Sequence, residues 1–206
     1  MHCIKDENIP SALIVNSNQT QLTYAQGCHL TYAEIDLKQI STVRNDEKQA
    51  LTVFISLTND DILLPFQAIY KSSSPHSLPS KKSLFYAEAV SAGFLFESSH
   101  TDTYWSTQGT MPNFINKILA PYFDQTIEAL RLPSDQHCLW QIDCWSVHCL
   151  KEFKDWMRVE HPKIVVNFVS ACLTSLFQPC DVGFQQVLKL ALKQLSHNDV
   201  VTEVLD

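Results

Sequence analysis

The chain has 206 residues, of which 45% are hydrophobic, enough apolar material for one full core and one domain. Its formal net charge of −7 and pI near 5.5 argue against a dedicated nucleic-acid-binding module, which usually carries a basic excess. No stretch approaches the roughly 18 to 20 apolar residues that a membrane span requires, and residues 1–7 lack a signal-peptide pattern. Seven cysteines without regular pairing favour a reduced intracellular compartment.

The first third of the chain is predicted to form strands. Residues 11–18 are a short apolar run rich in branched side chains, which is typical of a buried strand. Threonine and tyrosine recur over residues 22–32 and indicate a hairpin, and residues 49–57 have the pattern of another strand. A polar turn then leads into a strand over residues 62–70, so three successive antiparallel strands are expected.

A polar loop and a long helix follow. Residues 71–83 contain two prolines and six serines and are expected to be an exposed connection within one domain. Asn113 opens a pattern of apolar residues at helical spacing, and Pro121 within it should kink or split the helix. The predicted buried face consists of Phe114, Ile115, Ile118, Leu119, Tyr122, Phe123, Ile127 and Leu130.

The last third is predicted to alternate between strand and helix. A strand over residues 139–143 precedes a helix that begins near Leu150 and ends at His161–Pro162. Residues 163–169 form the next strand, and residues 182–195 form the last helix. The predicted buried face of that helix is Phe184, Val187, Leu188, Leu190 and Ala191.

This order of elements predicts an α/β fold with a mixed central sheet flanked by helices, the order expected of a ribonuclease-H-like domain. No internal repeat is present. The domain is expected to cover residues 11–195, with short extensions at 1–10 and 196–206.

Two apolar segments that each lead to an acidic residue indicate a candidate metal-binding site. Leu139–Asp143 has the pattern of a buried strand that places one carboxylate at its end, and Leu176–Gly183 carries a second at Asp181. Two carboxylates at the ends of core elements are a common way to hold divalent metal against a phosphodiester. A third segment, Leu13–Thr20, has the same character, but its candidate ligand is Asn18.

These segments resemble motifs of the DDE superfamily endonuclease domain of pogo/Tigger-type transposases. Asn16–Thr20 is similar to the family's N-x-D-[EQ]-T, Leu139–His148 to its second-acid motif with a histidine five positions on, and Phe177–Gly183 to Q-P-x-D-x-G. Leu64–Lys71 is similar to the family's L-P-x-x-x-I-x-K strand, and two further segments resemble fungal members: residues 103–107 and 118–123. The motifs occur in the family's order over roughly residues 11–195.

The resemblance implies DNA strand cleavage and transfer with two Mg²⁺ or Mn²⁺ ions, a nuclear location and DNA as partner, with a homo-oligomer as in transposase assemblies. It implies no small-molecule substrate and no membrane association. Asp143 and Asp181 would bind the metal, and His148 would orient the second acid or contact phosphate. One ion would activate the nucleophile and the other would neutralise the departing oxyanion, and hard cations favour carboxylate oxygens for both roles.

The sequence departs from the family at Asn18, which occupies the position of the first acid. An asparagine offers a carbonyl oxygen but no negative charge and no bidentate chelation. Loss of an outer-shell partner alone costs roughly 10–100-fold in affinity or activity, and loss of a charged ligand should cost more. Catalysis is therefore expected to be impaired or lost. Glu7 and the pair Asp60–Asp61 are alternative acids, but one precedes the strand and the other lies on a distant turn.

Simpler interpretations exist for the same residues. Asp143 would ordinarily be a capping residue, Asp181 a solvated acid and Asn18 a turn residue. Five neighbouring residues could form a zinc site or have a structural role, and the structural role is favoured. They are His137, Cys138, Cys144, His148 and Cys149. Core packing is favoured over base stacking for Trp140, Trp145 and Trp156. Gly183 is expected to allow close packing at a helix start.

Three functional interpretations follow: an impaired endonuclease-like domain, an inert module kept for binding or assembly, and a relic without function. No helix-turn-helix module precedes residue 11, so we expect a truncated element or fragment in which site-specific DNA recognition is missing.

Overall fold

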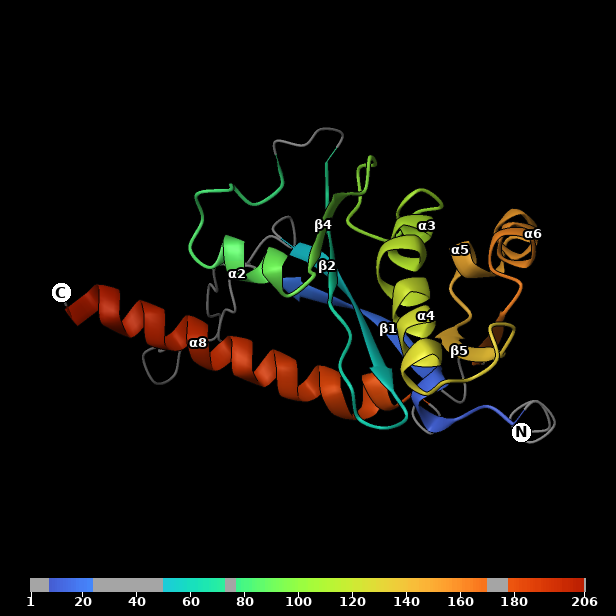
Figure 1. Ribbon diagram of the computed structural model, residues 1–206. Coiled ribbons are helices and arrows are strands. Elements are labelled where there is room, and N and C mark those ends of the chain that lie inside the picture. The colour runs from blue at the N-terminus through green and yellow to red at the C-terminus, as the bar shows by residue number, and fades with distance from the viewer. Residues whose placement is uncertain (1–7, 24–49, 73–76, 170–177, 206) are drawn as a thin grey trace, which may run out of the picture.

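A mixed six-stranded sheet forms the centre of the described part of the chain (Figure 1). The computed structural model describes residues 8–23, 50–72, 77–169 and 178–205, with side chains as far as residue 198. The strand order is β4-β3-β2-β1-β5-β6. The strands are β1 (Ile14–Thr23), β2 (Ala50–Thr58), β3 (Gln67–Tyr70), β4 (Leu95–Ser98), β5 (Cys138–Asp143) and β6 (Ile164–Val169).

The predicted antiparallel unit of three strands is confirmed, because β1 pairs with β2 and β2 with β3 in that sense. The last strand is shorter than expected. Within residues 62–70 only Gln67–Tyr70 forms β3, and Leu63 makes an isolated bridge to Leu57. Pro65 lies between them and has no N–H group to donate to a ladder. The predicted hairpin over residues 22–32 lies outside the described residues except for the end of β1.

Helices cover both faces of this sheet. The helical elements are η1 (Ser11–Leu13), α2 (Tyr86–Ser91), α3 (Thr110–Phe114), η3 (Ile115–Leu119), α4 (Ala120–Ala129), α5 (Ser146–Cys149), α6 (Lys151–Glu160), η5 (Cys180–Phe184) and α8 (Gln185–Leu205). Phe54 of β2 packs against Phe114 in the larger core, whereas its neighbours Val53 and Ile55 pack with Cys180 in the smaller one. Successive side chains of a strand point to opposite faces, so α3 and η5 lie on opposite sides of the sheet.

The helix predicted from Asn113 begins at Thr110 and contains a π-helical turn directly before Pro121. The N–H of Ala120 bonds to the carbonyl of Ile115, so the helix adds a residue at the point where proline removes a donor. The predicted face is largely confirmed. Leu130 is the exception: it is 48% exposed, because α4 ends at Ala129 before another turn can reach the core.

The prediction for the last helix was wrong in its buried face and its length. Phe184 and Leu188 pack against the smaller core, but Val187 is 65% and Leu190 58% exposed. The helix continues past Leu195 to Leu205 and extends beyond the edge of the sheet (Figure 1, red). The apolar stripe of α8 is wider than the part of the smaller core that it packs against among the described residues. The apolar pattern alone therefore predicted too much burial.

Four short elements, η1, α2, β4 and α5, were not predicted, and η1 takes residues 11–13 of the strand expected over residues 11–18. The six residues of α2 bury none of their side chains, and β4 has only four residues, so neither gives a periodic signal. β4 pairs in parallel with β3 and completes the edge of the sheet. Within the described residues, no helix is both long and apolar enough to span a membrane.

Glu97 of β4 provides a test of pH-dependent stability. Its carboxylate accepts a hydrogen bond of 2.7 Å from Gln67 Nε2 and lies 3.9 Å from Lys117 Nζ. Burial raises the pKa of Glu97, and the Gln67 bond and the Lys117 charge oppose this shift only in part. A raised folded-state pKa means that the stabilisation is present at low pH and is lost as pH rises through that pKa.

We therefore expect Glu97→Gln, which stays neutral, to become increasingly more stable than the wild type as pH rises. Urea unfolding at about pH 5 and about pH 8 measures the difference in free energy of unfolding between Glu97→Gln and the wild type. Glu88→Gln, which changes an exposed carboxyl of α2, is the matched control. A gap for Glu97→Gln that stays constant or narrows would contradict the expectation.

Candidate functional site

The candidate site residues come from three elements that meet around β1. Strands β1 and β5 are parallel neighbours, with Ile14, Val15 and Asn16 opposite Leu139, Trp140 and Gln141. Asn18 and Asp143 each lie two residues beyond the last of these pairs, at the same height on adjacent strands. Asp181 is in η5, which packs on β1 from one face.

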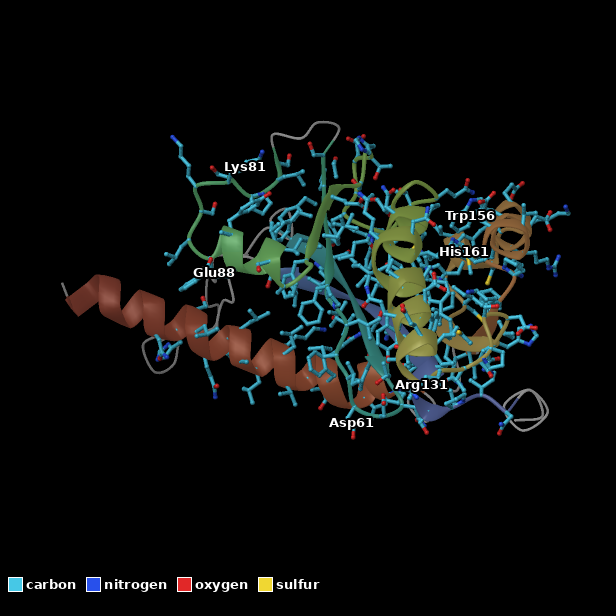
Figure 2. The ribbon with its side chains drawn as sticks, viewed as in Figure 1. Asp61, Lys81, Glu88, Arg131, Trp156 and His161 are labelled. Atoms are coloured by element: carbon cyan, nitrogen blue, oxygen red, sulfur yellow. The ribbon has the colours of Figure 1, made fainter. Side chains whose placement is uncertain are left out.

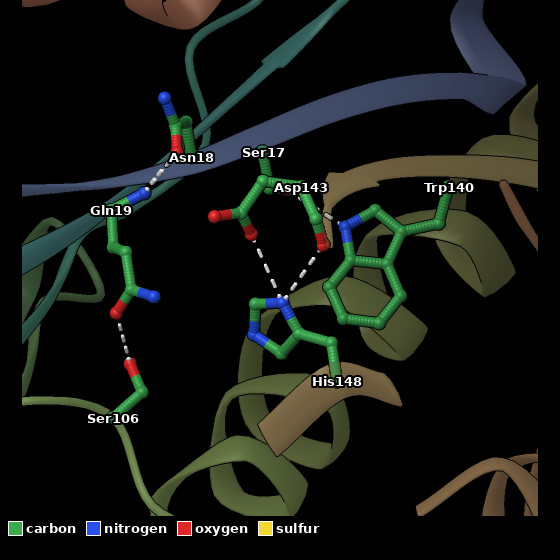
Figure 3. Close-up of polar contacts among 7 residues, drawn as sticks. All are labelled: Ser17, Asn18, Gln19, Ser106, Trp140, Asp143 and His148. Carbon is green, nitrogen blue, oxygen red and sulfur yellow. Dashed lines mark hydrogen bonds and ion pairs between the residues drawn. The ribbon is translucent and has the colours of Figure 1, made fainter. Parts of the chain in front are cut away.

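Asp143 is held by His148 of α5, as Figure 3 shows. The Nδ1 atom of His148 lies 3.1 Å from Asp143 Oδ1 and 3.3 Å from the Asp143 carbonyl oxygen. A carboxylate and a carbonyl only accept hydrogen bonds, so Nδ1 carries the hydrogen and donates. The imidazole is fully buried between Phe54 and Phe153. This burial is compatible with orientation of Asp143 and not with direct contact between His148 and a phosphate.

Asn18 is buried in β1, and its amide oxygen already has a partner. Asn18 Oδ1 accepts a 2.9 Å hydrogen bond from the backbone N–H of Gln19 (Figure 3). Asn18 is therefore a strand residue and not the turn residue of the simpler interpretation. A metal would have to share this oxygen with the Gln19 N–H.

Asp181 is brought to β1 by its neighbour Cys180. The Cys180 N–H donates to Asn16 Oδ1 at 3.2 Å, and the Cys180 thiol donates to the Asn16 carbonyl oxygen at 3.1 Å. Burial is the main cause that raises the pKa of Cys180 to about 12, so the thiol stays protonated and can act as this donor. Asp181 itself is half-buried.

Buried amide groups surround this junction of η5 and β1. Polar atoms of Asn16, Gln178 and Gln185 are buried without a hydrogen-bond partner in the described structure: Asn16 Nδ2, Gln178 Nε2 and Oε1, and Gln185 Nε2. Buried polar atoms normally have protein or water partners, so these positions are suited to ordered water.

A metal would find an incomplete set of ligands here. Asp143 and Asp181 offer carboxylate oxygens, which suit Mg²⁺ or Mn²⁺, and the Asp143 side chain is 24% exposed and thus accessible. Asn18 adds an oxygen without charge. The described residues contain no group of three or more His, Cys, Asp or Glu side chains placed to hold a metal ion. The oxygen donors of either acid suit a hard cation, but the contacts of the described residues do not join the two acids: Asp143 bonds to His148 on the Phe54 side of the sheet, and Asp181 lies in η5 on the other side.

The alternative acids Asp60 and Asp61 lie beside the start of β1, not beside Asn18. Asp60 accepts a hydrogen bond from Thr58 Oγ1 in the turn after β2, and Thr58 is opposite Val15 at the start of β1. Figure 2 labels Asp61 in the same turn, at the edge of the molecule. Glu7 lies outside the described residues.

The cysteines and Gly183 differ from one another in their surroundings. Cys138 is buried in the core, and burial raises its pKa to about 12, whereas Cys144 and Cys149 are exposed. Close packing at Gly183 was a wrong prediction, because a Cβ atom there would meet nothing within 4 Å. Core packing is confirmed for Trp140, which is fully buried, and for Trp156, which is partly buried and packs against the larger core, whereas Trp145 is partly buried and contacts Trp105.

Several supporting contacts were missed from the sequence. Trp140 Nε1 donates to Ser17 Oγ at 2.8 Å, and Ser17 in turn bonds to Ser56 Oγ at 2.6 Å. Ser106 Oγ donates to Gln19 Oε1 at 2.8 Å and fixes the loop before α3 to β1 (Figure 3). These partners are far apart in the chain and carry no shared local pattern. Only the register of the sheet could have indicated the Ser17–Ser56 pair.

Comparison with known proteins gives matches among solved structures. No protein-family model and no curated protein matches the sequence. The chain is similar to a pre-cleavage Mos1 transpososome, with 10% identity and a TM-score of 0.52 over 92% of this chain and 45% of that chain. It is also similar to the Mos1 mariner paired end complex with Mn, with 11% identity and a TM-score of 0.50 over 88% and 42%.

At these identities the similarity establishes the fold. The mixed sheet with flanking helices is the ribonuclease-H-like arrangement of transposase catalytic domains, and this prediction is confirmed. The chain spans less than half the length of the Mos1 transposase chains that it matches.

Proposed function

We propose that the chain is a transposase-derived DDE endonuclease-like domain of the pogo/Tigger kind, similar to fungal members, which binds DNA in the nucleus. Its metal-dependent strand cleavage and transfer is impaired because Asn18 replaces the first acid. One observation carries the proposal: Asn18 and Asp143 lie at equal height on adjacent parallel strands, and the Cys180–Asn16 bonds bring Asp181 to the same strand. The fold shared with Mos1 structures supports it.

Asp143 and Asp181 would hold Mg²⁺ or Mn²⁺, and one similar structure is a Mos1 complex with Mn. A bound divalent ion would polarise a phosphodiester and lower the pKa of an attacking water or hydroxyl group. His148 would keep the Asp143 carboxylate in one orientation through its Nδ1–H. Without a charge at position 18, the pair of acids would hold a second ion weakly.

Titration calorimetry with Mn²⁺ tests the assignment of the ligands. We expect the wild type to bind Mn²⁺ weakly and Asp143→Asn or Asp181→Asn to weaken binding by at least about 10-fold. Asp124→Asn is the control. Asp124 is an exposed carboxylate of α4 that pairs with Lys163, outside the site. Binding that is unchanged in Asp143→Asn would contradict the metal assignment.

The second candidate is a catalytically inert module for binding or assembly, as a homo-oligomer in the manner of transposase assemblies. The hydrogen bond from the Gln19 N–H to Asn18 Oδ1 favours it, since the oxygen that a metal would need is already used. The absence of any Mn²⁺ binding that depends on Asp143, together with retained DNA binding, would select this candidate.

A further inference from the structure

Three aromatic side chains form a row on the surface beside the candidate site. The ring centroids of Tyr104 and Trp105 are 5.3 Å apart, and those of Trp105 and Trp145 are 5.4 Å apart. All three residues are partly exposed. We call Tyr104, Trp105 and Trp145 the aromatic row.

Two loops place the aromatic row near Asp143 and Gln19. Trp145 follows Asp143 by two residues, in the link between β5 and α5. Trp105 precedes Ser106, whose hydroxyl bonds to the side chain of Gln19, the neighbour of Asn18 (Figure 3). The contact between Trp105 and Trp145 therefore joins the loop after β5 to the loop fixed on the Gln19 face of β1, which is the face opposite to that of the Asn18 side chain.

The row differs from the tryptophan that belongs to the core. Trp140 is fully buried, and its indole N–H donates to Ser17. Trp145 is partly exposed, but its Nε1 atom is buried and has no hydrogen-bond partner in the described structure. A tryptophan placed only for packing usually finds a partner for this donor. The row thus presents partly exposed ring surface, whereas Trp140 lies entirely within the core.

We infer that the aromatic row stacks an unpaired base of the DNA strand held at Asp143, an inference that rests on the proposed function. Aromatic rings bind unpaired bases by stacking, which tolerates every base because each has a π-face. Bases within a duplex are already stacked on each other and offer no free face. With a net charge of −7, the chain gains little general attraction to phosphates, so contacts that do not depend on charge matter more.

Fluorescence anisotropy with a labelled oligothymidine strand and a labelled blunt duplex tests the inference on the full chain. Trp105→Leu and Trp145→Leu keep apolar volume without a π-face, and we expect each to weaken single-strand binding by roughly 5- to 150-fold. Duplex affinity should stay within about 3-fold in both variants. Trp145→Phe keeps a ring and should retain most of the single-strand affinity.

Trp156→Leu is the matched control. Trp156 is also partly exposed, but it packs on Phe153 of α6 and on His161, which directly follows α6 (Figure 2 labels Trp156 and His161). Single-strand binding that is equal in the wild type, Trp105→Leu and Trp145→Leu would overturn the inference and leave the proposed function intact. An equal loss in Trp145→Leu and Trp156→Leu would also overturn it. If the wild type binds neither DNA, the proposed function fails as well.

Discussion

Replacing Asn18 by aspartate is expected to tighten Mn²⁺ binding by more than the roughly 10–100-fold that outer-shell partners control. The variant adds a negative charge in β1 at the height of Asp143. One carboxylate oxygen can continue to accept the Gln19 N–H, as Asn18 Oδ1 does, and the other becomes free for the metal. Titration calorimetry measures the affinity, and nicking of a supercoiled plasmid in Mn²⁺ measures the gain in activity.

Asn59→Asp is the control for added charge, since Asn59 is exposed in the turn after β2. It should leave both metal affinity and nicking at the wild-type level. If Asn18→Asp and the wild type bind Mn²⁺ equally and nick equally, position 18 is not a metal position. Robust activity in both would also show that Asn18 does not impair catalysis.

Replacing Phe114 by alanine is expected to destabilise the fold by about 3–5 kcal/mol, the usual cost of truncating a buried phenylalanine. Phe114 is fully buried at the end of α3, with its ring centroid 4.6 Å from Phe54 and 6.1 Å from Trp140. Removal of this ring leaves a cavity between the helix and two central strands. Urea unfolding followed by circular dichroism gives the change in free energy.

Leu130→Ala is the control for this prediction, because Leu130 belonged to the same predicted apolar face but is largely exposed. It should cost less than about 1 kcal/mol. Equal destabilisation by the two substitutions would mean that residues 114 and 130 contribute alike to the core, contrary to the structure.

The central sheet followed from local patterns, because its strands are apolar, short and separated by turn residues. The inner strands β1, β2 and β5 are buried on both faces, so their positions were clear even though their exact ends were not. The edge of the sheet was less predictable. β4 is partly exposed and short, and its parallel pairing with β3 depends on a connection through α2 rather than on its own sequence.

For the candidate site too, local sequence patterns indicated the residues but not the contacts that position them. Asn18, Asp143 and Asp181 were recognisable because each follows an apolar segment, and the histidine at 148 because of its fixed spacing from Asp143. The bonds that position them were not recognisable, since Cys180–Asn16 and Ser106–Gln19 join residues that only the fold brings together. The extent of α8 failed for a related reason, because an apolar stripe does not reveal where its packing surface ends.

The location of Mn²⁺ in crystals of the Asn18→Asp variant tests most directly whether the two acids form one metal site. We expect an anomalous peak within about 2.0–2.6 Å of carboxylate oxygens of both Asp143 and Asp181. A peak bound by only one of these residues, or bound elsewhere while both carboxylates point apart, would contradict a shared site and remove the basis for an endonuclease-like function.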